Sequence, residues 1–232
     1  ARSMLITAMA INILFGMSFS LLFAYTGMTS MGHAVYYGMG SYFMMICIIK
    51  LGIHPVASAL ISLAATSLLA VFLGTVCLKN GMLAFSFISM GIANTMTALF
   101  NKWSFVGTDV GLQMNFLPEW LMDYRVKYYV IVGTVAIVGT IFYLFTKSPF
   151  VMIAKGIREN EERLKFLGLN TKSQRLKIFV VSAFFASIAG VLYCVRSTGA
   201  YPAQLTNESS ILAIMMCMVG GTETFWGPIL GG

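Results

Sequence analysis

The sequence has little charge, and acidic residues are especially few. Only 10% of its 232 residues are charged, with eight Asp and Glu against fifteen Lys and Arg, while 58% are hydrophobic. Ordinary soluble domains carry roughly 25% charged residues, so this composition excludes a soluble globular fold. The net charge of +7 does not indicate nucleic-acid binding, because most of the basic residues fall in one loop. Membrane orientation and anionic lipid headgroups account for them there.

Groups that carry enzyme or metal chemistry are also scarce. The two histidines lie far apart in the sequence, and no nucleophile–base pair or metal-ligand set is visible. The cysteines lie in apolar runs without CxxC spacing, and we expect them to be free thiols that pack as small hydrophobic side chains. They are Cys47, Cys77, Cys194 and Cys217. We therefore predict no enzyme activity, no catalytic residue, no metal site and no cofactor.

Hydrophobic residues gather in long runs. A bilayer core needs roughly 20 apolar residues per helix, single spans satisfy their backbone hydrogen bonds as helices, and the alternation of barrel strands is absent. We expect an all-α polytopic membrane protein, a single transmembrane permease domain over residues 1–232, with about 7–8 spans here and further spans beyond the C-terminal end. The runs are 4–25, 35–50, 56–77, 82–100, 128–146, 178–195 and 209–220, with an unfinished one from 226.

One stretch near the start of the chain interrupts this apolar pattern. Residues 26–34 are too polar for lipid, yet too short and uncharged for an ordinary loop. Irregular backbone at membrane depth is tolerated only where protein buries it or where it lines a cavity. We expect a discontinuous helix here, with a substrate pathway formed by Thr29, Ser30, Gly32 and His33. In the alternative, structural interpretation, His33 satisfies free backbone groups, and Thr29 and Ser30 cap the following helix.

Basic charge is concentrated in residues 147–177, which hold eight of the fifteen Lys and Arg and three of the eight Asp and Glu. Lys and Arg resist translocation, so a basic loop marks the cytoplasmic side of a membrane protein. Alternation of the spans then places residues 101–127 and 196–208 together on the outside, and Lys79 on the inside. We therefore interpret 147–177 as a cytoplasmic coupling loop.

The loop itself has a helical pattern. Ser148 and Pro149 are suited to begin a helix, Gly168 is suited to end it, and Thr171 with Gln174 predicts a capping box for the next membrane helix. The apolar residues between follow steps of three and four, as in an amphipathic helix. They are Phe150, Ile153, Ile157, Leu164 and Leu167. The prediction is helix, tight turn, helix.

An amphipathic helix of this kind suits either a lipid surface or a protein partner. Its basic residues would lie on anionic headgroups in the first case. The acidic residues Glu159, Glu161 and Glu162 would be repelled there, but would pair with charges in a protein groove. We therefore favour docking to a cytoplasmic partner. The candidate docking residues are Arg158, Glu159, Asn160, Glu161 and Gly168.

Several blocks of residues together resemble a known family. They read Tyr-Thr-Gly at 25–27, Ser-Met-Gly-His-Ala at 30–34, Gly-Met-Gly-Ser-Tyr at 38–42, Ile-Arg-Glu-Asn-Glu at 157–161 and Leu-Gly-Leu-Asn at 167–170. The helix at 182–190 and the Gly-rich break at 220–228 agree with the same pattern. In this order the blocks resemble the permease subunits of branched-chain amino acid ABC importers, and the Arg-Glu-Asn-Glu form of the loop favours the M-type subunit.

The resemblance implies a permease of a bacterial or archaeal cytoplasmic membrane. Its partners would be cytoplasmic ATPase subunits, a second permease subunit, an extracytoplasmic substrate-binding protein and membrane lipid, with no role for nucleic acid. The chain has no G-x-x-x-x-G-K-[ST] phosphate loop, so it does not supply this ATP site itself. The resemblance implies inward transport of branched-chain or other small neutral amino acids.

Three departures from the family pattern leave the substrate open. The family commonly has Gln at the position of Met28, a Thr-Gly-Gly…Gly-Leu run in the external loop near 106–112, and Gly-Ser at the position of Glu223-Thr224. A permease for urea or short-chain amides is therefore an alternative, and a ribose-type sugar permease is a weaker one. In a different class, an ion-gradient-driven secondary transporter would place acidic residues within its spans, which this sequence does not do.

Overall fold

A computed structural model describes residues 2–79, 81–113, 123–221 and 226–232. Six of its helices are long and apolar enough to cross a membrane: α1 Arg2–Thr26, α2 Ala34–Leu51, α3 Pro55–Cys77, α4 Met82–Lys102, α6 Tyr124–Thr146 and α8 Thr171–Ser197. The remaining elements are η1 Ser104–Val106, η2 Thr108–Val110, β1 Leu112–Gln113, α7 Pro149–Phe166, β2 Gly199–Ala200, η3 Pro202–Leu205, α9 Asn207–Gly220 and α10 Gly227–Gly231. The all-α, multi-pass membrane fold expected from the sequence is confirmed.

The number of full-length spans is lower than the expected seven to eight. The run at 209–220 forms α9, a helix of 14 residues, which is about 21 Å long at 1.5 Å per residue and too short to cross a bilayer core of about 30 Å. The following α10 packs directly on it, because a Cβ atom on Gly220 would lie only 1.7 Å from the Gly227 carbonyl oxygen. Among the described residues, six helices have the length of a span.

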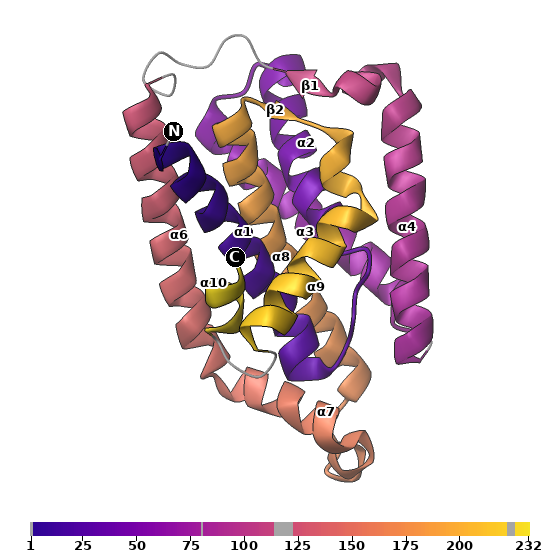
Figure 1. Ribbon diagram of the computed structural model, residues 1–232. Coiled ribbons are helices and arrows are strands. Elements are labelled where there is room, and N and C mark those ends of the chain that lie inside the picture. Colours follow the sequence, from indigo (N-terminus) through magenta and orange to yellow (C-terminus); the bar gives the residue numbers. More distant parts are fainter. Residues whose placement is uncertain (1, 80, 114–122, 222–225) are drawn as a thin grey trace.

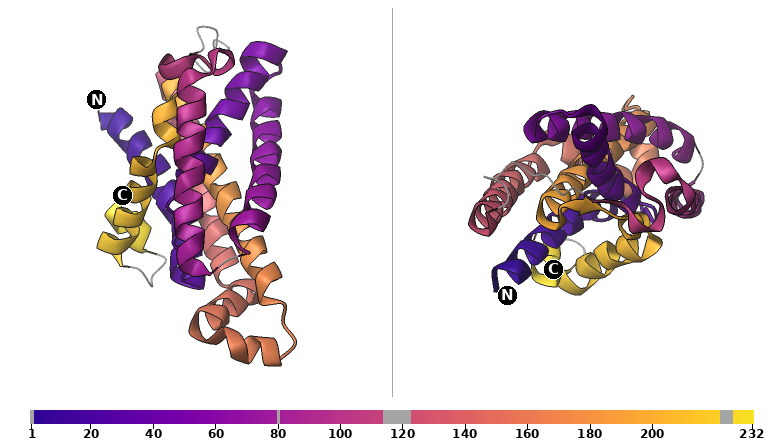
Figure 2. Two further views of the ribbon diagram at one scale, coloured as in Figure 1. Left: turned by 90° about the vertical axis from the view of Figure 1, so that its right-hand side faces the viewer. Right: turned by 90° about the horizontal axis from the view of Figure 1, so that it is seen from above.

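The helices form an inner group and an outer group (Figures 1 and 2). In α1, α2 and α8, 61–72% of the residues of the apolar stretch are buried inside the protein, whereas in α3, α4 and α6 the share is 17–28%. The outer three helices therefore present most of their apolar surface to their surroundings, which suits lipid or another membrane subunit.

Helices α2 and α8 approach closely because small residues face each other across their contact. A Cβ atom on Gly190 would lie 1.9 Å from the Tyr37 carbonyl oxygen, so only glycine fits there. Ser41 Oγ donates a 2.7 Å hydrogen bond to the Gly190 carbonyl oxygen. Ser182 and Ala186, on the same small-residue stripe of α8, are fully buried. Small residues favour this kind of helix contact in membranes, so this stripe of α8 serves helix packing.

The two ends of the bundle differ. At one end β1 pairs with β2 in antiparallel register, with Leu112 opposite Ala200, and at the other end α7 projects beyond the membrane helices (Figure 1). The expectation that residues 101–127 and 196–208 share one side is confirmed where the structure describes them. We refer below to the outer end, which carries β1 and β2, and to the loop end, which carries α7.

Candidate functional site

The break expected near 26–34 is present at residues 27–33, and it reverses the direction of the chain. The segment leaves the loop end of α1 and runs back beside that helix, so that His33 lies next to Ser18 and Tyr37 lies next to Phe15. Ser18 is eight residues before the end of α1 at Thr26, which at 1.5 Å per residue is about 12 Å inside the bundle. The break is thus a return segment between two antiparallel helices.

His33 is fully buried at the inner end of this return segment. Its Nε2 lies 3.0 Å from Ser18 Oγ. The Phe15 ring stacks on the imidazole with a centroid distance of 5.6 Å, and Phe19 and Tyr36 pack edge-on at 5.7 and 6.1 Å. A polar ring is therefore enclosed by aromatic side chains, with one hydroxyl as its hydrogen-bond partner.

Serines of three helices bond to the backbone of the return segment and of its neighbours in α1 and α2. Ser86 Oγ of α4 donates a 2.5 Å hydrogen bond to the Thr29 carbonyl oxygen. Ser210 Oγ of α9 accepts a 2.9 Å bond from the Ala34 backbone N–H, and Ser182 Oγ of α8 donates a 2.6 Å bond to the Ser18 carbonyl oxygen. Each buried polar group of the irregular backbone that finds such a partner avoids the cost of desolvation.

Gly32 allows the closest contact between the return segment and α4. A Cβ atom at this position would lie 2.0 Å from the Ser89 carbonyl oxygen. Any larger residue would push the segment away from α4 or change its path. Of the four residues predicted for the pathway, Gly32 therefore shapes the segment, while Ser30 and His33 supply its buried polar side chains.

Two polar atoms of the segment have no hydrogen-bond partner within the described residues. They are Ser30 Oγ and His33 Nδ1, and both side chains are fully buried. An unsatisfied buried polar atom costs about 1–3 kcal/mol, so such groups need an explanation. Ser30 Oγ and His33 Nδ1 are therefore the two buried polar atoms of the segment that packing leaves unsatisfied.

The structural alternative for Thr29 and Ser30 does not match the geometry. Neither side chain caps α2, because the cap position is His33, which makes no side-chain cap bond. The free N–H of Ala34 is bound by Ser210 from α9 instead. Ser18 and Ser210 were missed at the sequence level. Their signal is a hydroxyl inside an apolar run, which by itself does not show what the hydroxyl meets.

The coupling loop at the other end is a bent helix. Helix α7 has a non-helical residue at Asn160, with φ −158° and ψ 96°, and Asn160 Oδ1 accepts a 3.0 Å hydrogen bond from the Arg163 N–H. Asn160 therefore caps a second short helix within α7. Gly168 has a left-handed φ of +79°, which confirms it as the residue that ends the loop helix.

The helix start predicted at Ser148 and Pro149 is confirmed, because Ser148 is the N-cap residue of α7 and Pro149 lies in its first turn, although Ser148 makes no side-chain cap bond. The capping box predicted for α8 is wrong. The cap of α8 is Asn170, whose side chain accepts from the Ser173 N–H at 3.0 Å, so the predicted box at Thr171 is displaced by one residue. The Thr171 hydroxyl is used elsewhere, because it donates a 2.9 Å hydrogen bond to Glu161 Oε1.

Glu161 joins the second part of α7 to the start of α8. Besides the bond from Thr171, its Oε2 accepts a 2.7 Å bond from Arg175 Nη2, and Lys165 Nζ lies 3.4 Å from its Oε1. Partial burial of the Glu161 carboxyl works against its ionisation, but the Thr171 hydrogen bond and the positive charges of Arg175 and Lys165 prevail, and its pKa is lowered. Glu161 is thus engaged within the loop.

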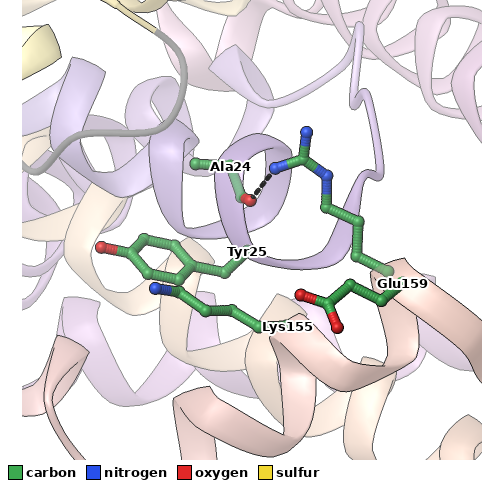
Figure 3. A pocket seen from close by; sticks show the side chains of 5 residues that line it. Ala24, Tyr25, Lys155 and Glu159 are labelled. Atoms are coloured by element: carbon green, nitrogen blue, oxygen red, sulfur yellow. Dashed lines mark hydrogen bonds between the residues drawn. The ribbon is translucent and has the colours of Figure 1, made fainter.

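Arg158 and Glu159 line a cavity of about 420 Å³ where α7 meets the loop end of α1 (Figure 3). Arg158 Nη1 donates a 2.6 Å hydrogen bond to the Ala24 carbonyl oxygen. Lys155 Nζ lies 5.1 Å from the centre of the Tyr25 ring, a cation–π distance. Through Lys155 and Arg158, α7 is therefore attached to the end of α1, the helix that precedes the return segment.

The outermost part of α7 is exposed and has mixed chemistry. Phe166 is 88% exposed and Leu167 is 70% exposed, and the Glu159 and Glu162 side chains are also accessible. We call Glu159, Glu162, Phe166 and Leu167 the loop tip. Apolar residues flanked by charges at a projecting tip suit a protein groove. Glu223 and Thr224, where the family commonly has Gly-Ser, lie outside the described residues.

Comparisons with known proteins agree with this architecture. Residues 2–232 match the family described as branched-chain amino acid transport system / permease component. The LivM permease of the Escherichia coli K12 high-affinity branched-chain amino acid transport system is 24% identical over 140 residues, which is 60% of this chain and 32% of that protein. No solved structure gave a match.

Two further relatives widen the range of substrates named in the family. A probable LivM branched-chain amino acid permease of Methanocaldococcus jannaschii is 24% identical over 192 residues, or 79% of this chain and 54% of its own length. The xylose transport permease XylH of Escherichia coli K12 is 30% identical over 110 residues, or 47% and 28%. The matched parts thus span about half or less of these relatives. Because the family match extends over the whole membrane bundle, the chain belongs to the branched-chain amino acid transport system permease family.

Proposed function

We propose that the chain is the membrane subunit of an ATP-driven importer, and that it passes branched-chain or other small neutral amino acids inward. Separate ATPase subunits drive it from the loop end. A second permease subunit packs beside it within the membrane, and a substrate-binding protein delivers the solute at the outer end. The residues of the return segment, Thr29, Ser30, Gly32 and His33, form part of the pathway.

The observation that carries this proposal is the connection from the loop to the return segment. The loop tip is exposed and projects away from the bundle. Arg158 of α7, in contrast, is hydrogen-bonded to Ala24 at the end of α1. Three residues further along the chain the return segment begins, and it leads to His33. A displacement of the loop tip is therefore transmitted to the closed polar site, as in other rigid-body switches between packed arrangements.

Within the loop, the structure separates the predicted docking residues by their contacts. Glu159 is accessible and available to a partner, and Asn160 provides the bend that exposes the loop tip. Glu161 and Gly168 keep the loop folded, and Arg158 connects it to α1. Docking therefore depends directly on Glu159 and the rest of the loop tip, and indirectly on Asn160, Glu161 and Gly168, which shape the loop, whereas Arg158 transmits the movement of the loop to α1.

A sugar such as a pentose is the second candidate substrate, favoured by the similarity to a xylose permease. An ion-gradient-driven carrier is less consistent with the sequence. None of the six long helices contains Asp or Glu, although such carriers commonly place ionisable acids within their spans.

The first test is purification of the full-length protein from its native membrane in mild detergent, with the co-purifying proteins identified by mass spectrometry. We expect an ATPase and a second permease. The charge-reversing pair E159K and E162K should then release the ATPase while leaving membrane insertion intact. E208K, at an exposed position in the first turn of α9, is the matched control and should retain it. Isolation of the wild-type chain alone, under conditions that keep a related importer assembled, would overturn the proposal.

A further inference from the structure

A cavity of about 520 Å³ opens at the outer end, between the start of α1, the start of α6 and the end of α8. Its lining combines cations with aromatic rings that carry hydroxyl groups. The residues are Met4, Thr7, Tyr124, Lys127, Tyr128, Ile131, Tyr193, Arg196, Ser197 and Tyr201. We call this space the outer cavity.

The charge of the outer cavity has one sign. Lys127 and Arg196 both line it, and none of its described lining residues is acidic. Within the described chain, neither cation has a recorded ion pair or side-chain hydrogen bond, and both side chains are partly buried. Two cations that are partly removed from water and lack a carboxylate partner favour an anionic group between them.

The outer cavity is adjacent to a second, smaller space that leads toward the return segment. Tyr193 lines both, and the second cavity, of about 230 Å³, is also lined by Asn12, Gln204 and Ser209. Gln204 is only 4% exposed, and its Nε2 makes no hydrogen bond of acceptable geometry, although the Tyr37 hydroxyl lies beside it. We call this space the Gln204 cavity.

The side chains on the inner wall of the Gln204 cavity also enclose His33. Phe15 and Tyr37 line the cavity, and their ring centres are 4.7 Å apart. Phe15 also stacks on His33, with ring centres 5.6 Å apart. Tyr193 lies 5.8 Å from Tyr37, between the two cavities. Aromatic side chains therefore separate three successive polar sites: the outer cavity, the Gln204 cavity and the closed His33 site.

We propose that the outer cavity binds the carboxylate of an amphipathic solute through Lys127 and Arg196, before the solute passes Tyr193 toward the Gln204 cavity. The tyrosine rings accept the apolar part, and the cations discriminate a carboxylate from its uncharged analogue. This inference rests on the proposed import of amino acids and adds a selectivity site to it.

A lipid phosphate is the competing occupant, because tyrosines and cations are common at membrane interfaces. The Gln204 cavity, which lies further inward, favours a transported solute over a lipid phosphate as the occupant. A headgroup site has no need of a buried amide at Gln204 or of a second cavity that ends on Phe15 and Tyr37. Arg196 also lies in the last turn of α8, where a cation stabilises the helix terminus. Because its replacement would also weaken the helix, the test must measure substrate selectivity as well as uptake.

The test measures ATP-driven uptake of labelled leucine by the assembled transporter in vesicles, with leucinamide as the competing ligand that lacks the carboxylate. Loss of one charge-assisted contact should raise the KM for leucine about tenfold in K127M or R196M. The same variants should lose the preference for leucine over leucinamide. The conservative variants K127R and R196K should restore both. R125M is the control, since Arg125 is in the same turn of α6 but does not line the cavity.

The outcomes separate the two proposals. A wild-type transporter that moves no amino acid overturns the proposed function and this inference with it. A wild type that moves leucine, with KM and selectivity unchanged in both variants, overturns the inference alone. The assay is repeated in phosphatidylcholine vesicles with and without phosphatidylglycerol. An effect of R196M that occurs only with the anionic lipid would assign the cations to a headgroup and also overturn the inference.

Discussion

Arg158 donates a hydrogen bond from Nη1 to the carbonyl oxygen of Ala24, at 2.6 Å and across 134 residues of sequence. The carbonyls in the last turn of a helix have no intrahelical partner, and a guanidinium is a strong donor to them. The Arg158 side chain also packs against Gly27, the first residue of the return segment, which has a left-handed φ of +72°. One residue of the coupling loop thus contacts both sides of the point where the return segment begins.

Replacement of this contact should uncouple the loop from the pathway. R158M keeps much of the length of the side chain but removes its donors, so we expect ATPase subunits to remain bound while ATP-driven uptake falls about fivefold or more. The measurement is uptake per assembled complex in vesicles. K172M, at an exposed position at the start of α8, is the control for lost positive charge. Equal uptake by R158M and wild type would show that the contact carries no coupling.

The two histidines offer a matched comparison. H33A removes a fully buried ring and its bond to Ser18, so we expect uptake to fall about tenfold or more and stability to fall by about 2–4 kcal/mol. The ATPase should stay bound. H54A, at an exposed helix start where Nδ1 accepts from the Val56 N–H, should change stability by about 1 kcal/mol or less. Thermal unfolding and uptake are measured on both, and normal uptake kinetics in H33A would reduce His33 to a structural role.

Gly32 packs against α4, whereas Gly91 lies within α4. The two glycines differ in the space around them. G32A would place a Cβ atom 2.0 Å from the Ser89 carbonyl oxygen, whereas a Cβ atom at Gly91 meets nothing within 4 Å. We expect G32A to destabilise the protein by about 1–3 kcal/mol and to reduce uptake by displacing the return segment. G91A should be neutral, or stabilising by about 0.5–1 kcal/mol through helix propensity. Melting temperatures that move equally in both variants would contradict this assignment.

The Glu161 network predicts a pH dependence for the loop. Its pKa is lowered in the folded protein, so the carboxylate contributes stability above the usual Glu pKa of about 4.3, and this contribution is lost as pH falls through the lower folded value. We expect hydrogen exchange in residues 161–175, corrected for its intrinsic pH dependence, to be constant from neutral pH to about pH 5 and to rise below about pH 4. E161Q should exchange faster at neutral pH and lack this transition. An identical pH profile in E161Q would exclude Glu161 as the cause.

Much of the architecture follows from local sequence. The six long helices match the predicted apolar runs at 4–25, 35–50, 56–77, 82–100, 128–146 and 178–195 to within four residues, except that α8 begins at Thr171, seven residues before its run. The match is close because the length of an apolar run is a property of the run itself. The coupling loop and its end at Gly168 follow from charge and from the conformational freedom of glycine. The error at Thr171 arose because neighbouring residues competed for one cap, and Asn170 provided it.

The sequence by itself determined that this protein is a helical membrane protein, that its helices are interrupted near residues 26–34, and that one loop carries the basic charge. Composition and periodicity are sufficient for those conclusions because each depends on neighbouring residues. Only the tertiary structure decided that the interruption turns back beside α1, that Ser18 meets His33, and that Arg158 reaches Ala24. These contacts join residues far apart in the sequence, and they form only when helix packing brings the partners together.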